Sequence, residues 1–236
     1  ALNDCVTLPG TTDSNAKGNP NALKPALQKP QLLHLTRKHS YVGPAWYQRT
    51  IDVPREMAGK PLLIKLERVM WLSSLWVDGK QVGEPQESLV APHVYVLPEG
   101  LNAGKHTIAL RIDNSKQHDI SVDNLAHAYT NDTQVMWNGV LGEMTIEALP
   151  YVYISNLRIY PDTNARKVRV VADVMNLTKK TVKGDLSLSI NPLAAHASLA
   201  PCKQSYTFVP GDNAISVELT IPFDVKQWDM HSPNLF

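Results

Sequence analysis

Two pairs of glutamates are the candidates that residue type offers for acid/base chemistry. Catalysis by paired carboxyl groups requires both to face the same reacting bond. Glu84 and Glu87 lie in a stretch that predicts an irregular polar loop. Glu143 and Glu147 alternate along a predicted strand, where both side chains would point into solvent. Neither pair is therefore predicted to be catalytic.

The other residue types that support catalysis or metal binding are scattered along the chain. His118, Asp119 and His127 are the nearest approach to a ligand set, but their spacing matches no zinc pattern. Cys5 and Cys202 fall in different predicted domains, which excludes a thiolate metal site and a disulfide within either domain. The sequence has no G-x-S-x-G elbow and no phosphate-binding glycine loop. It predicts no catalytic residue, no metal and no cofactor.

Charge and composition argue against two classes of partner. The 236 residues include 23 Lys and Arg against 22 Asp and Glu, a formal net charge of +1. Because no basic stripe is present, nucleic acid is not an expected partner. No run of about 18 apolar residues occurs, so a membrane span is not expected either. The length suits one large or two ordinary domains.

The most strongly patterned stretch predicts antiparallel β-structure. Residues 46–53 alternate large apolar with polar side chains at period two, and a second apolar run covers residues 62–66. Residues 75–82 have the pattern of a hairpin whose turn is Asp78-Gly79. This dipeptide is typical of a two-residue type I′ turn, because both central positions take φ > 0. The chain is therefore organised around a β-scaffold.

Further strands are predicted on both sides of Pro150, which marks the domain boundary. Residues 104–113 place Ile108, Leu110 and Ile112 on one apolar side, and residues 144–149 form the last strand of the first domain. In the second domain, strands are predicted at residues 153–160, 168–174, 184–190, 205–209 and 214–221. Their spacing suits a seven-stranded immunoglobulin-like sandwich. The prediction is an all-β protein with domains at residues 1–150 and 151–236.

Several short motifs occur in a fixed order over nearly the whole chain. They are VTLPGTTD (6–13), GPAWYQRTIDVP (43–54) followed by WVDGKQVG (76–83), LNAGKHTIALRIDN (101–114), QVMWNGVLG (134–142) and WDMHSPNLF (228–236). Together they resemble the N-terminal sugar-binding jelly roll and the following immunoglobulin-like domain of glycoside hydrolase family 2. This family includes relatives of β-galactosidase, β-glucuronidase and β-mannosidase. The resemblance implies a jelly-roll β-sandwich followed by an immunoglobulin-like β-sandwich.

The same resemblance implies a function. Family 2 enzymes are retaining exo-glycosidases whose two catalytic glutamates lie on a (β/α)8 barrel that these residues do not include. The chain is thus expected to be a non-catalytic N-terminal portion, inactive alone. Its expected partners are the barrel of the same full-length chain and a terminal β-linked sugar, most consistent with a β-galactoside. Resemblance to exported enzymes places it in the periplasm or outside the cell.

The resemblance also assigns candidate sugar-binding residues. The segment before the Trp-Gly motif contributes an acidic or amide side chain to sugar hydroxyls in the family, which here corresponds to Asn131, Asp132 and Gln134. Carboxylates and amides bind hydroxyls, and an aromatic such as Trp137 or Tyr129 can pack on a pyranose. Alternatively, Asn-Asp-Thr is an ordinary turn and Trp137 a core anchor.

The polar loop at residues 11–20 is a second candidate. Loops of this region can lie at the mouth of the family's active site, so Asp13, Asn15 or Lys17 could meet sugar. The alternative is a plain surface loop, since the segment is almost wholly turn-forming.

Two features depart from the family pattern and leave other functions open. Glu143 stands where the family commonly has arginine, and the strand that usually precedes V-x-L-P is missing. The alternatives to a glycosidase portion are a free-standing carbohydrate-binding module and a purely structural pair of sandwiches. We expect weak or undetectable sugar binding if the chain is a glycosidase portion, whereas micromolar affinity would favour the free-standing binding module.

Overall fold

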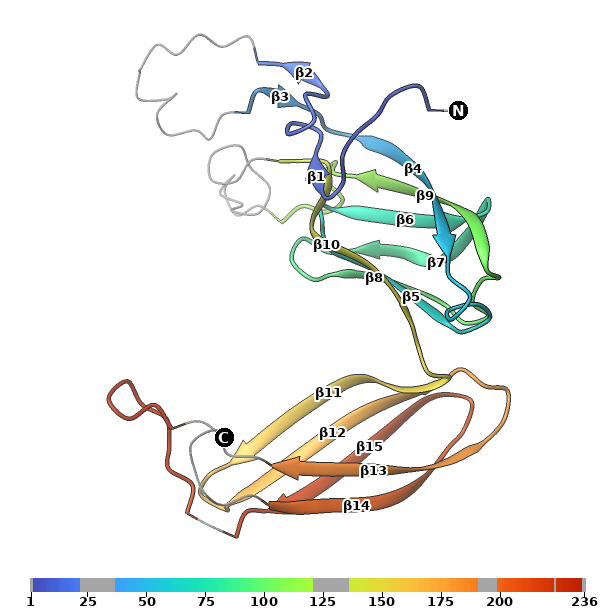
Figure 1. Ribbon diagram of the computed structural model, residues 1–236. Coiled ribbons are helices and arrows are strands. Elements are labelled where there is room, and N and C mark those ends of the chain that lie inside the picture. Colours follow the sequence, from blue (N-terminus) through green and yellow to red (C-terminus); the bar gives the residue numbers. More distant parts are fainter. Residues whose placement is uncertain (1, 22–36, 121–135, 191–198, 223, 235–236) are drawn as a thin grey trace. The chain divides into compact units, whose positions relative to one another are not determined.

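The chain folds as two compact units, Ala1–Ala148 and Leu149–Phe236. The structure is a computed structural model that describes all residues except 1, 22–36, 121–135, 191–198, 223 and 235–236. Every regular element of the described part is a β-strand (Figure 1), which confirms the all-β prediction. The described residues include no helix long and apolar enough to cross a membrane.

The first unit is a sandwich of two four-stranded antiparallel sheets, with strand orders β1-β10-β5-β8 and β4-β9-β6-β7. A short pair, β2-β3, lies beside them. The strands are β1 (Gly10–Thr11), β2 (Asn19–Pro20), β3 (His39–Ser40), β4 (Pro44–Val53), β5 (Leu62–Val69), β6 (Leu72–Val77), β7 (Lys80–Glu87), β8 (His93–Leu97), β9 (Gly104–Asp113) and β10 (Gly139–Ala148).

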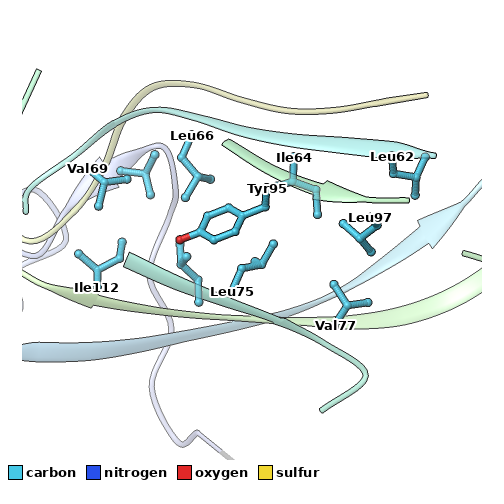
Figure 2. Packing of buried hydrophobic residues seen from close by; sticks show 11 residues of the cluster. Leu62, Ile64, Leu66, Val69, Leu75, Val77, Tyr95, Leu97 and Ile112 are labelled. Carbon is cyan, nitrogen blue, oxygen red and sulfur yellow. The ribbon is translucent and has the colours of Figure 1, made fainter. Parts of the chain in front are cut away.

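The core of the first unit lies between these two sheets. Figure 2 shows Tyr95 of β8 among aliphatic side chains from both sheets. On β9, Leu110 and Ile112 are buried, whereas Ile108 is only partly buried. Alternation along β9 therefore directs the predicted side inward. Each fully buried side chain of this kind contributes about 1.5–3 kcal/mol to stability.

The hairpin formed by β6 and β7 turns at Asp78-Gly79, as the sequence predicts. Val77 pairs with Lys80, and Asp78 and Gly79 have φ of 48° and 78°. Asp78 also accepts hydrogen bonds outside the turn: Oδ1 from the Thr107 backbone N–H at 2.8 Å, while Oδ2 lies 2.6 Å from His106 Nδ1. The turn is thereby attached to the middle strand β9.

Two sequence predictions for the first unit need correction. Glu84 and Glu87 do not lie in an irregular loop but on β7, the edge strand of its sheet. Strand β10 begins at Gly139 rather than at Met144, with a register shift between Leu141 and Met144. A bulge interrupts the period-two alternation, so the first half of this strand is hidden from a pattern search.

The second unit contains five strands in its described residues. Three form the sheet β11-β12-β15 and two form the sheet β13-β14. The strands are β11 (Val152–Asp162), β12 (Lys167–Asn176), β13 (Val182–Ile190), β14 (Leu199–Phe208) and β15 (Gly211–Thr220). Each overlaps a strand predicted from the sequence. The core is made of Ala172, Val174, Phe208, Ile215, Val217 and Leu219.

Strand β11 of the second unit keeps an apolar side exposed. Ile154, Leu157 and Ile159 pair with Val174, Ala172 and Val170 of β12 and so point to the same face as these buried residues. Their exposed fractions are nevertheless 48%, 49% and 60%. The inward face of β11 is thus not covered by the described residues of the two-stranded sheet.

Candidate functional site

Of the five residues predicted to bind sugar, two lie in the described part of the chain. Asn131, Asp132 and Gln134, and also Tyr129, lie outside the described residues. Asp13 and Trp137 are described, and both are partly buried. Their positions define the candidate site as the end of the first unit where residues 11–18 meet residues 137–139.

Strands β1 and β10 bring two of the motifs together. Gly10 pairs with Val140 and Thr11 with Gly139, and the Thr12 N–H donates to the Asn138 carbonyl at 2.8 Å. Gly139 has φ of 132°, and a Cβ at this position would collide with the Gly10 carbonyl oxygen. Only glycine allows this approach. The loop of VTLPGTTD is therefore fixed against the Trp-Asn-Gly segment.

The loop at residues 11–17 is held by its own side chains. Asn15 accepts from the Thr7 N–H at 2.7 Å and donates to the Thr7 and Thr11 carbonyls at 3.1 and 2.8 Å. Lys17 Nζ lies 2.6 Å from Asp4 Oδ1. Two residues that the sequence offers as sugar ligands thus have structural contacts, which satisfy part of their hydrogen-bonding capacity.

Asp13 connects this loop to strand β3. Its Oδ1 accepts from the His39 backbone N–H at 2.7 Å and lies 3.6 Å from His39 Nδ1. The Asp13 side chain is 30% exposed. These contacts fix the course of the loop, and the exposed part of the carboxylate can still meet a solvent-borne hydroxyl group.

A buried network of side-chain amides lies next to the candidate site and fixes residue 138, which follows Trp137. The Asn138 side chain donates to the carbonyls of Gly43 and Ile112 at 3.0 and 3.2 Å and to Asn114 Oδ1 at 3.3 Å. Its Oδ1 accepts from the Tyr47 hydroxyl at 2.7 Å. Asn138 and Asn114 are both fully buried. The network therefore ties two other stretches of the chain, residues 43–47 and 112–114, to the residue that follows Trp137.

Two further bonds extend the network to the chain that enters β4. Asn114 accepts from the Gly43 N–H at 2.9 Å and donates to the Tyr41 carbonyl at 2.9 Å. Burial, and secondarily the neighbouring Tyr41, raises the pKa of Tyr47 to about 12. Its hydroxyl therefore stays protonated and remains a donor to Asn138 at physiological pH. Sequence reasoning missed this network, although Asn138 lies inside the WNG motif.

A buried Ser-His-Tyr cluster lies elsewhere in the first unit. Ser73 Oγ is 2.5 Å from His93 Nδ1 and 2.7 Å from the Tyr95 hydroxyl. All three residues are buried, His93 to 1% exposure, and burial lowers the pKa of this histidine. A substrate could not reach the serine in this position. The cluster therefore satisfies polar groups inside the core.

The described carboxylates offer no catalytic pair or metal centre. Glu87 accepts from the Trp71 indole N–H at 3.0 Å and lies 2.8 Å from His118 Nε2. Glu143 is exposed, and its backbone N–H donates to Glu67 Oε2 at 2.7 Å. No group of three or more His, Cys, Asp or Glu in the described ranges could hold a metal ion. The described residues of the site thus offer hydrogen-bonding groups, among them the partly exposed Asp13 carboxylate.

The sequence is similar to a family model and to a curated relative. Residues 4–118 match the family model described as "Beta-galactosidase second all-beta domain". A curated relative, the "Putative beta-glucuronidase" of Formosa agariphila, is 22% identical over 194 residues, which are 82% of this chain and 17% of the relative.

Two solved structures share the fold. The β-glucuronidase of Bacteroides uniformis matches with a TM-score of 0.73 and 18% identity, covering 98% of this chain and 26% of its own. The GH2 β-galacturonidase of Eisenbergiella tayi, bound to galacturonate, matches with a TM-score of 0.61 and 21% identity, covering 96% of this chain and 34% of its own. The chain thus spans a minor part of the length of the proteins it resembles.

Proposed function

We propose that this chain, which fits the non-catalytic β-domains of glycoside hydrolase family 2, is the N-terminal portion of a retaining exo-glycosidase. Its two units would support a catalytic barrel on the same polypeptide, and the first unit would lend a loop to the sugar pocket. The observation that carries this proposal is the coverage: the fold match includes 98% of this chain but only 26% of a β-glucuronidase chain.

The contacts of the described carboxylates are consistent with a structural, non-catalytic role for this chain. Retaining hydrolysis requires two carboxyl groups about 5–5.5 Å apart, one as nucleophile and one as acid/base. In the described ranges, Asp13, Glu67 and Glu87 instead make structural hydrogen bonds to backbone or indole donors. The reactive carboxyl groups would then come from the barrel.

The loop proposed to reach the sugar contains Asn131, Asp132 and Gln134. The support for this assignment is its position in the sequence, because Asn138, four residues after Gln134, belongs to the buried amide network. Trp137 would offer its exposed part to a pyranose face.

We propose a terminal β-galactoside as the substrate, supported by the description of the matching family model. A terminal β-uronide is a second candidate, because the curated relative and two solved structures are named for glucuronide or galacturonide cleavage. A uronide carries a carboxylate at C6 where a galactoside carries a hydroxymethyl group, and a glucuronide differs from a galactoside also in the configuration at C4. They are therefore separable with paired chromogenic substrates.

The test is hydrolysis of aryl β-galactoside and aryl β-glucuronide by the full-length enzyme and by the 236-residue chain. We expect activity only in the full-length enzyme, with preference for the galactoside. Asp132→Ala in the full-length enzyme should lower kcat/KM by about tenfold to a hundredfold. Cleavage by the 236-residue chain alone, or a gene that encodes no barrel after residue 236, would refute the proposal and favour a free-standing binding module.

A further inference from the structure

The outer face of the sheet β4-β9-β6-β7 carries two tryptophans in contact. Trp46 lies on β4 and Trp76 on β6, and their ring centroids are 4.9 Å apart with an interplanar angle of 41°. Their strand neighbours Tyr47 and Leu75 pack in the core. Because successive side chains point to opposite faces, both tryptophans point outward. Trp46 is 50% exposed.

The middle strand β9 leaves room for this contact. Trp76 pairs with Ala109, and Ala109 pairs in turn with Gln48 of β4. The methyl group of Ala109 is too small to separate the rings, so Trp46 and Trp76 meet diagonally above it. The two rings form one continuous apolar surface, which we call the Trp46–Trp76 platform.

Polar side chains surround this platform. Gln48 and Gln81 lie at the two ends of the row that contains Trp76, and both are exposed. Arg111 pairs with Trp46 and donates to Asp113 at 2.9 Å, which orients its guanidinium group. Amide and guanidinium groups supply donors, and the amides also supply acceptors. The platform thus combines aromatic faces with fixed hydrogen-bonding groups.

The composition of this face distinguishes between two kinds of partner. Sites for protein partners usually combine aromatic anchors with aliphatic side chains in a desolvated centre. Here the large aliphatic residues next to the platform, Leu75 and Leu110, point inward and are buried. A pyranose has an apolar C–H face and a rim of hydroxyl groups, which matches aromatic rings bordered by glutamines and an arginine.

We propose that the Trp46–Trp76 platform binds a β-linked polysaccharide, with sugar rings stacked on the indoles and hydroxyl groups bonded to Gln48, Gln81 and Arg111. This inference goes beyond the function proposed above, because it gives the chain a sugar site on the strands of one sheet face. The flat face of a sheet suits an extended polymer, whereas a loop pocket suits a sugar end.

Affinity electrophoresis of the 236-residue chain tests the proposal. Gels would contain soluble β-1,4-galactan, β-1,4-mannan or mixed-linkage β-glucan, and a gel without polysaccharide gives the reference mobility. We expect retardation by at least one polymer. Trp46→Ala should weaken this binding by about tenfold or more, since a single stacking contact is removed. Trp228→Ala is the matched control, because Trp228 is 61% exposed and lies in the second unit.

A second variant separates a loss of binding from a loss of folding. Gln48→Ala removes an exposed amide without changing the core, and we expect a smaller loss of binding with an unchanged circular dichroism spectrum and Tm.

The absence of retardation by all three polymers, or equal retardation of the wild type and Trp46→Ala, would overturn the proposal. Protection of β4 from hydrogen exchange in the full-length enzyme without polysaccharide would assign the face to a protein contact instead. Hydrolysis of aryl glycosides is a separate measurement, so failure of this proposal leaves the proposed function intact.

Discussion

The two units bury polar side chains in different ways. In the first unit, the Asn138 side chain bonds to residues from β4, β9 and the segment before β4, which are remote in sequence. In the second unit, Asn176 bonds mainly within its own turn, to Thr178 and Lys180, and to one distant carbonyl, that of Phe208. Both asparagines are fully buried. The first unit thus uses buried amides to hold a shaped loop end, whereas the second uses one to close a turn.

The units also differ in how completely their sheets cover each other. The first unit packs four strands against four around a core that includes Tyr95. The second unit packs three strands against two in its described residues, and Leu157 and Ile159 stay exposed. The described residues thus leave part of the three-stranded sheet of the second unit uncovered.

A charge in either core would show whether the units fold independently. Leu110 is 4% exposed, and Leu110→Asp should destabilise the first unit by more than about 4 kcal/mol, because an unpaired charge would be buried. Ile215→Asp is the matched variant in the second unit. Two-dimensional NMR spectra should lose the signals of one unit and keep those of the other. Loss of both sets of signals from either variant would show a single cooperative fold.

Removal of the two buried amides compares the networks directly. Asn138→Ala removes the acceptor of the Tyr47 hydroxyl and the donor to the Gly43 and Ile112 carbonyls, so we expect a loss of about 3 kcal/mol in the first unit. Asn176→Ala should cost less, about 2 kcal/mol, because its partners lie close to solvent-exposed turn residues. Denaturant unfolding measures both. A larger loss for Asn176→Ala would contradict the proposed difference between the units.

Acid should weaken the first unit before the second. Burial lowers the pKa of His93, so the unfolded chain binds a proton more readily than the folded one. The contribution of neutral His93 to the free energy of unfolding is fully present above about pH 6.5, the ordinary histidine pKa. It is lost as the pH falls below this value, by up to about 1.4 kcal/mol per pH unit. Unfolding between pH 5 and 7 measures this slope. His93→Gln should flatten it, and an unchanged slope would exclude His93 as the cause.

The turn of the first unit should show a smaller dependence of opposite sign. The hydrogen bond from His106 to Asp78 raises the pKa of the histidine. Its contribution is therefore present below the ordinary histidine pKa and is lost as the pH rises through the raised value. Asp78→Asn keeps a turn-forming residue and removes the charge. Comparing the pH dependence of its Tm with that of the wild type checks the sign.

Local patterns predicted the elements whose determinants are close in sequence. The β6-β7 turn needs only Asp78 and Gly79, and β9 needs only its own alternation. Strand β7 was misjudged because Gly83 and Pro85 interrupt its pattern, yet an edge strand tolerates both. The boundary predicted at Pro150 lies two residues after Ala148, where the first unit and its last strand β10 end.

The candidate site was less accessible to sequence reasoning. Asp13 and Trp137 could be proposed as polar and aromatic groups near a motif, but their partners are distant along the chain. The role of Asn138 depends on carbonyl groups at Gly43 and Ile112, which no periodicity reports. Buried polar networks are satisfied by three-dimensional neighbours, so a sequence pattern identifies their members only by chance.

The contact between Gly10 and Gly139 links two motifs that lie far apart in the sequence. Neither backbone can retreat without breaking the β1-β10 pair, so this contact requires glycine at position 139, whereas a Cβ at position 10 would instead meet the Thr7 carbonyl oxygen. Engineers who graft either motif into another scaffold should transplant both together. A homologue that has replaced Gly139 should route its N-terminal loop differently.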